Sequence, residues 1–276
     1  MDKNNTYYSH TQGLKLLESA ILENGPIFTI DKIKPIAKTQ GLSDTNLRFL
    51  INSLASSGWI EIIKRGTYVV KSPIYNYEIP PFAIAAALVK PMAISHWSAC
   101  ALHGFTNQIP SIVQASTPRK VVTPEMRSGH ANSPRGRAIW KTCDIEFEFI
   151  NVRQDAFWGF NQEWVNSWQQ VNITDLDRTG LDLIARPDIF GGISASIEVL
   201  ENALGQLNID RLVNYAIKYN TGSIIKRLGW ALEKLGVPLE SLVPLHNFPV
   251  RRYFLLDLGS NADAPRNARW HIIENL

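Results

Sequence analysis

The sequence of 276 residues is poor in cysteine and has no long apolar run. Cys100 and Cys143 are too few for a disulfide framework. The chain contains no stretch of about 18 or more apolar residues, so the sequence predicts no membrane-spanning helix. Its first ten residues, MDKNNTYYSH, lack the basic-then-apolar pattern of a secretion signal. We therefore expect a cytoplasmic protein.

Motifs of the common nucleotide-binding and hydrolytic enzymes are also missing. The sequence has no Walker loop and no GxGxxG, HExxH or GxSxG pattern. His96 and His103 flank Cys100 at a spacing that fits no zinc signature, and we interpret both as neutral structural histidines. The sequence predicts no catalytic residue, no metal site and no cofactor, and we expect the protein not to be an enzyme.

One alternative from the enzyme class stays open. Residues 145–149 alternate apolar and acidic side chains, as in a strand with one buried face. Asp144, Glu146 and Glu148 supply carboxylates there, and carboxylates are the ligands of Mg²⁺ in metal-dependent nucleases and phosphodiesterases. No lysine accompanies them on that strand, so we favour a solvated sheet face.

What the chain does contain is enough apolar sequence for more than one core. Hydrophobic residues make up 45% and charged residues 19% of the chain, which is the composition of a folded protein. At about 100–200 residues per domain, the length predicts two domains.

Charge is distributed unevenly along the chain although the net charge is only +3. Residues 1–71 carry a net charge of +3 and residues 119–141 a net charge of +5, whereas residues 142–276 carry −5. Segregation of this kind favours a side of the molecule that faces a polyanion.

The first 71 residues have the order of elements of a winged helix-turn-helix. Asp31 and Ser43 are predicted to cap the second and third helices, and Lys64-Arg65-Gly66 to close a terminal hairpin. Only a few residues separate the two middle helices, as that motif requires. The predicted elements are helices around residues 14–21, 33–37 and 43–54, and strands at 27–30, 59–63 and 67–70.

The third helix is the best candidate for a functional surface. Its apolar stripe of Leu47, Leu50, Ile51 and Leu54 is predicted to face inward. Arg and Asn on the other side are the side chains that pair with guanine and adenine edges in the major groove of DNA. The hairpin tip is placed to reach phosphates or the minor groove. The predicted DNA-binding residues are Ser43, Thr45, Asn46, Arg48, Asn52, Lys64, Arg65 and Thr67.

Residues 72–80 are predicted to be a linker, and residues 81–276 to form a larger mixed α/β C-terminal domain. The fold class is therefore α+β. Thr174 with Asp177 is predicted to form a capping box, and residues 251–258 and 269–273 to be terminal strands. Scattered basic residues of a central loop and of the helix at 223–235, on the side opposite its apolar stripe, form a predicted secondary basic surface: Arg119, Lys120, Arg127, Arg135, Arg137, Arg227 and Lys234.

Three segments together resemble the AbiEi family of antitoxins. Residues 94–106, ISHWSACALHGFT, resemble its SHxSALxxHGLT element, which continues through residues 108–119. Residues 173–187, ITDLDRTGLDLIARP, followed by Gly191-Gly192, resemble VTDxERTLLDLLxRP…GG. Residues 212–236 resemble LxxYAxxxxxxxxxRLGYLLExLG. With the preceding winged-helix pattern, the resemblance spans roughly residues 10–258.

The sequence departs from this pattern at two positions. Asp177 stands where the family usually has glutamate, and Gly180 where leucine is common. A glycine inside a helix costs about 1 kcal/mol relative to alanine, so we expect a close packing contact at Gly180.

The resemblance implies a role in a type IV toxin–antitoxin system of abortive infection, a form of phage defence. Such antitoxins are encoded beside a nucleotidyltransferase-like toxin. Their N-terminal winged helix binds inverted repeats in promoter DNA and represses the operon, and their C-terminal domain counters the toxin. Neutralisation with and without direct toxin contact both stay open. So does the alternative of a DNA-binding transcriptional regulator whose C-terminal domain is a sensor and has no toxin partner.

Overall fold

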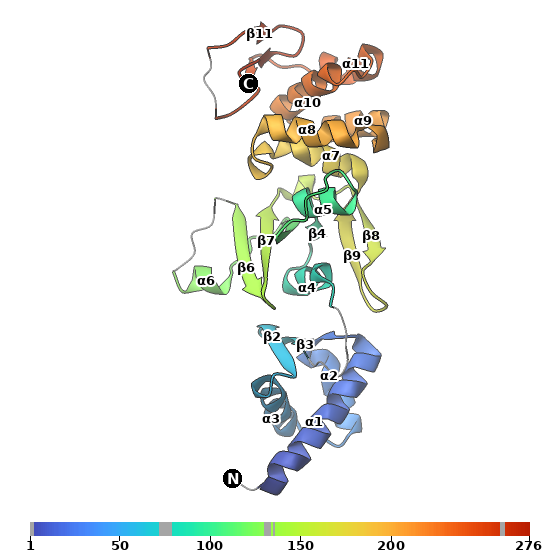
Figure 1. Cartoon of the computed structure of the whole chain (residues 1–276), viewed down its shortest axis with the longest axis vertical. Helices are drawn as coiled ribbons and strands as arrows, with labels where there is room; N and C mark the ends of the chain where they lie inside the picture. The colour runs from blue at the N-terminus through green and yellow to red at the C-terminus, as the bar shows by residue number, and fades with distance from the viewer. Residues whose placement is uncertain (1–2, 72–78, 130–133, 135, 260–262) are drawn as a thin grey trace.

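The computed structural model describes residues 3–71, 79–129, 134, 136–259 and 263–276, and shows a mixed α/β chain. We call residues 3–71 the N-terminal part and residues 79–276 the C-terminal part. Figure 1 shows the N-terminal part at one end of the molecule, a six-stranded sheet in the middle and a group of helices at the other end. Within the described ranges, no helix combines the length and apolar character needed to cross a membrane.

The N-terminal part packs three helices against a small antiparallel sheet with strand order β1-β3-β2. The inward residues predicted for the third helix, Leu47, Leu50, Ile51 and Leu54, are all buried. The elements are α1 (Lys3–Asn24), β1 (Ile27–Thr29), α2 (Ile30–Thr39), α3 (Asp44–Ser56), β2 (Ile60–Lys64) and β3 (Thr67–Val70).

The caps of the middle helices explain where they begin. Ser43 caps α3, as predicted, because its hydroxyl accepts a hydrogen bond from the Asn46 backbone N–H at 3.2 Å. The prediction for α2 was wrong by two residues. This helix begins at Ile30 with Thr29 at its cap position, and Asp31 lies in the first turn, where its negative charge favours the positive end of the helix dipole.

Strand β3 of the small sheet is buried on both faces. Phe28 and Tyr68 are paired across β1 and β3 and point toward the helices of the N-terminal part, with ring centroids 5.8 Å apart. Their neighbours Ile27 and Val69 are also paired, and they point the other way. There they share a core with residues of the C-terminal part, because successive side chains of a strand alternate between faces.

A polar contact accompanies this packing between the two parts. The Glu61 carboxylate on β2 accepts hydrogen bonds from the Thr142 hydroxyl and the Cys143 backbone N–H, at 2.9 and 2.8 Å. It also pairs with Lys71. These bonds from Lys71, Cys143 and Thr142 lower the pKa of Glu61, although burial alone would raise it. The N-terminal sheet is thus docked by both apolar and charged contacts. Residues 72–78 of the predicted linker (72–80) lie outside the described residues.

The C-terminal part begins with a six-stranded mixed sheet in the order β6-β7-β5-β4-β9-β8. Helix α4 (Pro81–Leu88) contacts β5 and β9, and α5 (His96–Leu102) contacts β5. A short helix, α6 (Pro124–Arg127), interrupts the predicted central loop. The strands are β4 (Ala93–Ile94), β5 (Ile112–Thr117), β6 (Arg137–Thr142), β7 (Ile145–Asn151), β8 (Phe160–Trp164) and β9 (Gln170–Thr174).

Helices dominate the rest of the C-terminal part and enclose a second large core. Gly180 makes the close contact expected there, because a Cβ at this position would lie 3.2 Å from Leu207 Cδ1. The elements are α7 (Leu176–Ala185), α8 (Ile193–Ala203), α9 (Ile209–Tyr219), α10 (Gly222–Lys234), α11 (Leu239–Asn247), β10 (Phe254–Leu255), β11 (Arg266–Asn267) and β12 (Ile272–Ile273).

Two predictions for this region were wrong in detail. The cap of α7 is Asp175, whose carboxylate accepts from the Arg178 N–H at 2.8 Å. Asp177 is instead buried and binds the Asn208 N–H and the Arg211 guanidinium. The terminal strands are shorter than predicted, and just after β10 the Asn275 side chain accepts hydrogen bonds from the backbone N–H groups of residues 256 and 257.

Gly229 on α10 generates a prediction about stability. A Cβ there would overlap the ring of Trp270, which is fully buried. We expect Gly229→Ala to lower the free energy of unfolding by roughly 3 kcal/mol, because an overpacked core must shift. Urea denaturation measures this. Gly205→Ala is the matched control, because Gly205 has open space around its Cα and should change stability by less than about 0.5 kcal/mol. Equal stability of the two variants would contradict the packing argument.

Candidate nucleic-acid interface

The outer face of α3 is open to solvent. Thr45, Asn46, Arg48 and Asn52 are all exposed, as the helical periodicity predicts. Phe49 lies among them with 61% of its surface exposed. The helix is held from behind by α1, α2 and β2. It therefore presents one arginine and two amides on a packed helix, and these are side chains able to form hydrogen bonds to base edges.

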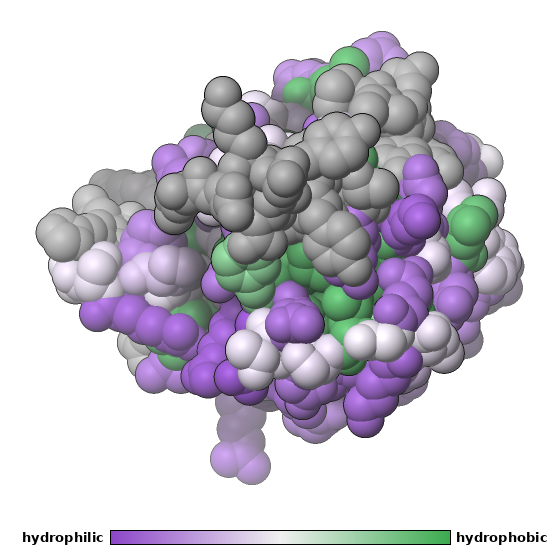
Figure 2. All heavy atoms as spheres, turned by 90° about the horizontal axis from the view of Figure 1, so that it is seen from below, coloured by the Kyte–Doolittle hydropathy of each residue, from purple (hydrophilic) through white to green (hydrophobic). Residues whose placement is uncertain are grey.

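The end of the molecule formed by the N-terminal part carries this polar character together with some apolar surface. Figure 2 shows that end, with hydrophilic residues around a smaller apolar area. Leu22 and Phe49 are exposed apolar residues of the N-terminal part, with 79% and 61% of their surfaces accessible.

The start of α3 is built from Ser43, whose hydroxyl is already used as the helix cap. Ser43 is exposed, so its oxygen still faces solvent. The first turn of the helix offers unpaired backbone N–H groups and a partial positive charge, both suited to phosphate. Asp44 is exposed in the same turn and opposes an anion there.

The hairpin tip is not arranged as the sequence suggested. Arg65 is exposed, and Gly66 adopts the positive φ of 73° that a tight turn requires. The Lys64 ammonium instead turns toward the C-terminal part and donates to the Leu88 carbonyl oxygen at 2.9 Å. Burial, followed by the charge of Lys90, lowers the pKa of Lys64. The prediction for Thr67 was wrong in placement, because Thr67 is only 4% exposed and lies in the wall of a cavity and not on the outer surface.

The central basic residues divide into two groups. Arg119, Lys120 and Arg127 are exposed. Arg137 is instead a structural residue: its guanidinium Nε donates to Glu148 Oε1 at 2.5 Å, and that carboxylate is only 2% exposed. Arg135 lies outside the described residues.

The prediction of a basic, solvent-exposed face on α10 was wrong for Arg227. Arg227 is 6% exposed and donates from Nε and Nη2 to the Leu255 carbonyl oxygen, at 2.9 and 2.8 Å. Trp230 is 5% exposed, and its indole donates to Glu274 at 2.6 Å. The C-terminal strands cover this side, so helical periodicity identified only one of two buried faces. Lys234 is exposed, with its ammonium 5.5 Å from the centre of the Trp230 ring.

The three carboxylates of the nuclease alternative have separate partners. Asp144 lies in the β6–β7 turn and is almost fully exposed, whereas Glu146 pairs with Lys141. Glu148 accepts from Arg137 and, at 2.8 Å, from the Gln114 amide, so it does not lie on a solvated face. No cluster of three potential metal-ligating residues occurs among residues that the structure describes.

The residues around α5 have structural contacts. The Nδ1 atom of His96 lies 2.8 Å from the Ser95 hydroxyl, and burial lowers the pKa of His96 to about 4. Its ring is therefore neutral at neutral pH, as predicted. Nε2 of His103 lies 2.7 Å from the Thr174 carbonyl oxygen. Burial raises the pKa of the Cys100 thiol, so a reactive thiolate is disfavoured.

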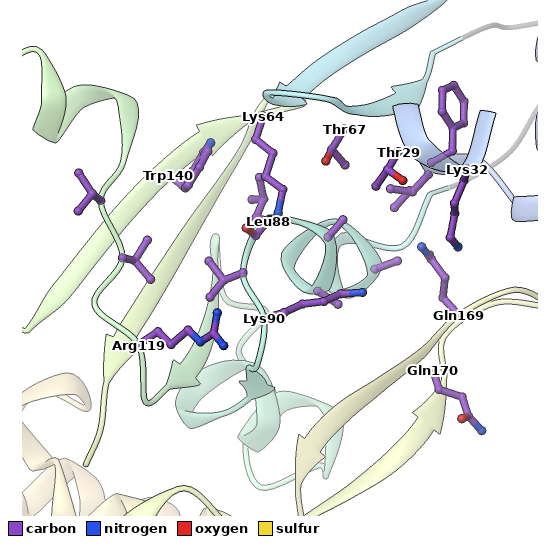
Figure 3. Close-up of a pocket in the computed structure, with 18 of the residues that line it drawn as sticks. Thr29, Lys32, Lys64, Thr67, Leu88, Lys90, Arg119, Trp140, Gln169 and Gln170 are labelled. Carbon is purple, nitrogen blue, oxygen red and sulfur yellow. Dashed lines mark hydrogen bonds between the residues drawn. The ribbon is translucent and has the colours of Figure 1, made fainter. Parts of the chain in front are cut away.

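A cavity of about 610 Å³ at the junction of the two parts was not predicted from the sequence. Lys64, Arg119, Lys120 and Arg127 line it together with two cations that no motif singled out, Lys32 and Lys90. Figure 3 shows Lys32 and Lys64 entering from the N-terminal part and Lys90 and Arg119 from the C-terminal part. The excess of basic residues at 1–71 and 119–141 was the available signal, but only the fold brings these segments together.

Comparisons with known proteins bear on the fold alone. No protein-family model and no curated protein matches the chain. Among solved structures, the crystal structure of the RV2827C protein from Mycobacterium tuberculosis is similar to it, with a TM-score of 0.65 and 13% sequence identity. The alignment covers 96% of this chain and 92% of that one, so the arrangement of both parts is shared.

The Arg137–Glu148 pair generates the second prediction. Arg137→Ala should lower the free energy of unfolding by about 3 kcal/mol, because it leaves a buried carboxylate without its charged partner. Thermal or urea unfolding measures the loss. The double variant Arg137→Met/Glu148→Met should recover much of it, because the buried charge is gone as well. Arg127→Ala is the control and should leave stability nearly unchanged, because Arg127 is exposed. A wild-type unfolding curve for Arg137→Ala would contradict this assignment.

Proposed function

We propose that this chain is a DNA-binding autorepressor and antitoxin of the AbiEi type. In this proposal the N-terminal part is a winged helix-turn-helix: α2 and α3 are its two middle helices and the β2–β3 hairpin is the wing. The open outer face of α3 carries the proposal, because Arg48, Asn46 and Asn52 are exposed there and the C-terminal part does not cover them.

The proposed contact with DNA uses α3 in the major groove. Arg48 is suited to guanine and the two asparagines to adenine, because these side chains match the hydrogen-bonding edges of those bases. Thr45 is suited to a thymine methyl group or to phosphate. The exposed Arg65 supplies charge to the adjacent backbone.

The hairpin contributes less to this contact than a free wing would. Lys64 is engaged by Leu88, and Thr67 is buried, so Arg65 is the cation of the hairpin that remains for DNA. We therefore assign base recognition to α3 and only one phosphate contact to the hairpin. This revises the set of DNA-binding residues to Ser43, Thr45, Asn46, Arg48, Asn52 and Arg65.

The third prediction separates base recognition from phosphate contact. Arg48→Ala should reduce the preference for DNA upstream of the chain's own reading frame over unrelated duplex by about tenfold or more, because one bidentate contact is lost. Arg65→Gln should weaken binding to both duplexes about equally and reduce the slope of log affinity against log salt by about 1. Gel-shift titration at several salt concentrations measures both effects.

Lys234→Gln is the control for these variants, because Lys234 is an exposed cation on α10, at the other end of the molecule. It should bind both duplexes as the wild type does. Wild-type preference in Arg48→Ala would exclude α3 as the reading helix, and wild-type salt dependence in Arg65→Gln would exclude the hairpin contact.

The antitoxin half of the proposal rests on the resemblance of residues 94–119, 173–192 and 212–236 to the AbiEi elements. These segments lie in the C-terminal part, on α5, β5, β9, α7, α9 and α10. Their motif residues hold the core together: Asp177 binds Arg211, and Tyr215 donates to Asp175 at 2.8 Å. The proposed partner is a nucleotidyltransferase-like toxin encoded next to this chain.

The fourth prediction concerns the toxin. Co-expression of the chain with the neighbouring reading frame should restore growth that the neighbour alone prevents. Arg48→Ala should restore growth equally, because its change lies on the DNA-reading helix, while expression from the operon promoter should rise. Plate growth and a promoter reporter measure the two effects. No rescue by the wild-type chain, with repression intact, would favour the regulator without a toxin.

A further inference from the structure

The cavity at the junction of the two parts has the size of a small-molecule site. Its volume of about 610 Å³ lies within the range of about 300–1,000 Å³ usual for ligand pockets, which often occur between domains. Its walls come from β1, β2 and α2 of the N-terminal part, and from α4, β6 and the segment after β5 in the C-terminal part.

The charged residues described in the walls are all of one sign. Among the residues that the structure describes, six cations and no carboxylate line the cavity: Lys32, Lys64, Lys90, Arg119, Lys120 and Arg127. Within the described ranges, none of the six forms an ion pair with a carboxylate. Other cations of the chain, such as Arg137 and Arg178, are paired. This concentration of unpaired cations in a concave space favours an anionic ligand.

Two of these cations are held near each other by the fold. Lys64 donates to the carbonyl oxygen of Leu88, two residues before Lys90, and the charge of Lys90 contributes to lowering the pKa of Lys64. The positive charges of Lys64 and Lys90 repel each other. An anion between them would reverse the sign of that interaction and bind each through charge-assisted hydrogen bonds.

The rest of the lining is apolar or neutral. Alanine, leucine, valine and isoleucine side chains of α4, β1 and the segment after β5 form much of it, with Trp140 on β6 and the amides of Gln169 and Gln170 at the rim of the neighbouring strands. A ligand that fits must therefore carry both concentrated negative charge and an apolar or flat group.

We propose that this cavity binds a small molecule with two or more phosphate groups and an apolar ring, of the nucleoside di- or triphosphate class. Phosphates contact Lys64, Lys90 and Arg119, and the ring lies on the apolar wall that includes Trp140. A concave site of this volume accommodates one such molecule, whereas a duplex backbone needs an open surface. Because both parts line the site, the ligand also holds them together. This inference does not depend on the proposed DNA binding.

The test is calorimetric titration of the full chain with ATP, tripolyphosphate and AMP. We expect ATP to bind, tripolyphosphate to bind more weakly and AMP to bind weakest. Lys90→Gln and Arg119→Gln should each weaken ATP binding by about tenfold, because each removes one charged contact to phosphate. Both side chains are exposed at the cavity without a carboxylate partner, so these variants should keep the wild-type unfolding curve.

Lys38→Gln is the matched control, because Lys38 is an exposed lysine of α2 that does not line the cavity. It should bind ATP as the wild type does. Tripolyphosphate binding as tight as ATP would overturn the assignment of the apolar wall to a ring. Lack of binding of both at about 1 mM, or equal ATP binding by wild type and both cavity variants, would overturn the site. If the wild type does not bind ATP and the two cavity variants lose affinity for duplex DNA, the small-molecule site is also overturned. The cavity would then belong to the DNA-binding surface.

Discussion

The docking of the N-terminal sheet on the C-terminal part is the constraint on which the rest of the molecule depends. Ile27, Ile63 and Val69 are buried in a core that they share with α4, while Phe28 and Tyr68 face the opposite way. Burying one such apolar side chain contributes about 1.5–3 kcal/mol, so the junction is stabilised by several of them together. The outer side of α3 takes no part in this docking and stays exposed. The same docking turns Lys64 toward the C-terminal part and brings the walls of the basic cavity together.

The sequence was sufficient for the parts of the fold that depend on local periodicity. A stripe at helical spacing predicted the buried side of α3 and therefore its exposed side, and Ser43 marked the start of that helix. The same reasoning was wrong for α10, where Arg227 and Trp230 lie opposite the main stripe but are covered by a distant segment. The second buried face of α10 carries polar groups, so it does not appear as an apolar stripe in the sequence. Arg227 on that face binds a carbonyl oxygen, and Trp230 binds a carboxylate.

Long-range pairing accounts for the other differences between sequence and structure. The alternation of apolar and acidic residues in β7 predicted that Glu148 lies on a solvated face. A strand with neighbours on both sides can bury such a face when those neighbours supply hydrogen-bond partners for the carboxylate. Arg137 on β6 and Gln114 on β5 are the partners, because β7 lies between those two strands. Register between strands that are distant in sequence cannot be read from the spacing of residues. The basic cavity has the same origin, since its cations come from segments as far apart as Lys32 and Arg127.

The distribution of partners among the basic residues separates structural from functional charge. Arg137, Arg178 and Arg227 are buried or half-buried, and each has a carboxylate or carbonyl oxygen that repays its desolvation. Arg48 on α3 and Arg65 at the hairpin tip are exposed, and so are Lys90 and Arg119 at the junction. A buried cation is explained by its partner in the fold, whereas unpaired cations gathered on one surface raise the electrostatic energy of the folded chain unless an anion arrives. Since the α3 face is open and the junction is concave, the two groups suit anions of different shape: an extended duplex on the first and a compact phosphorylated molecule in the second.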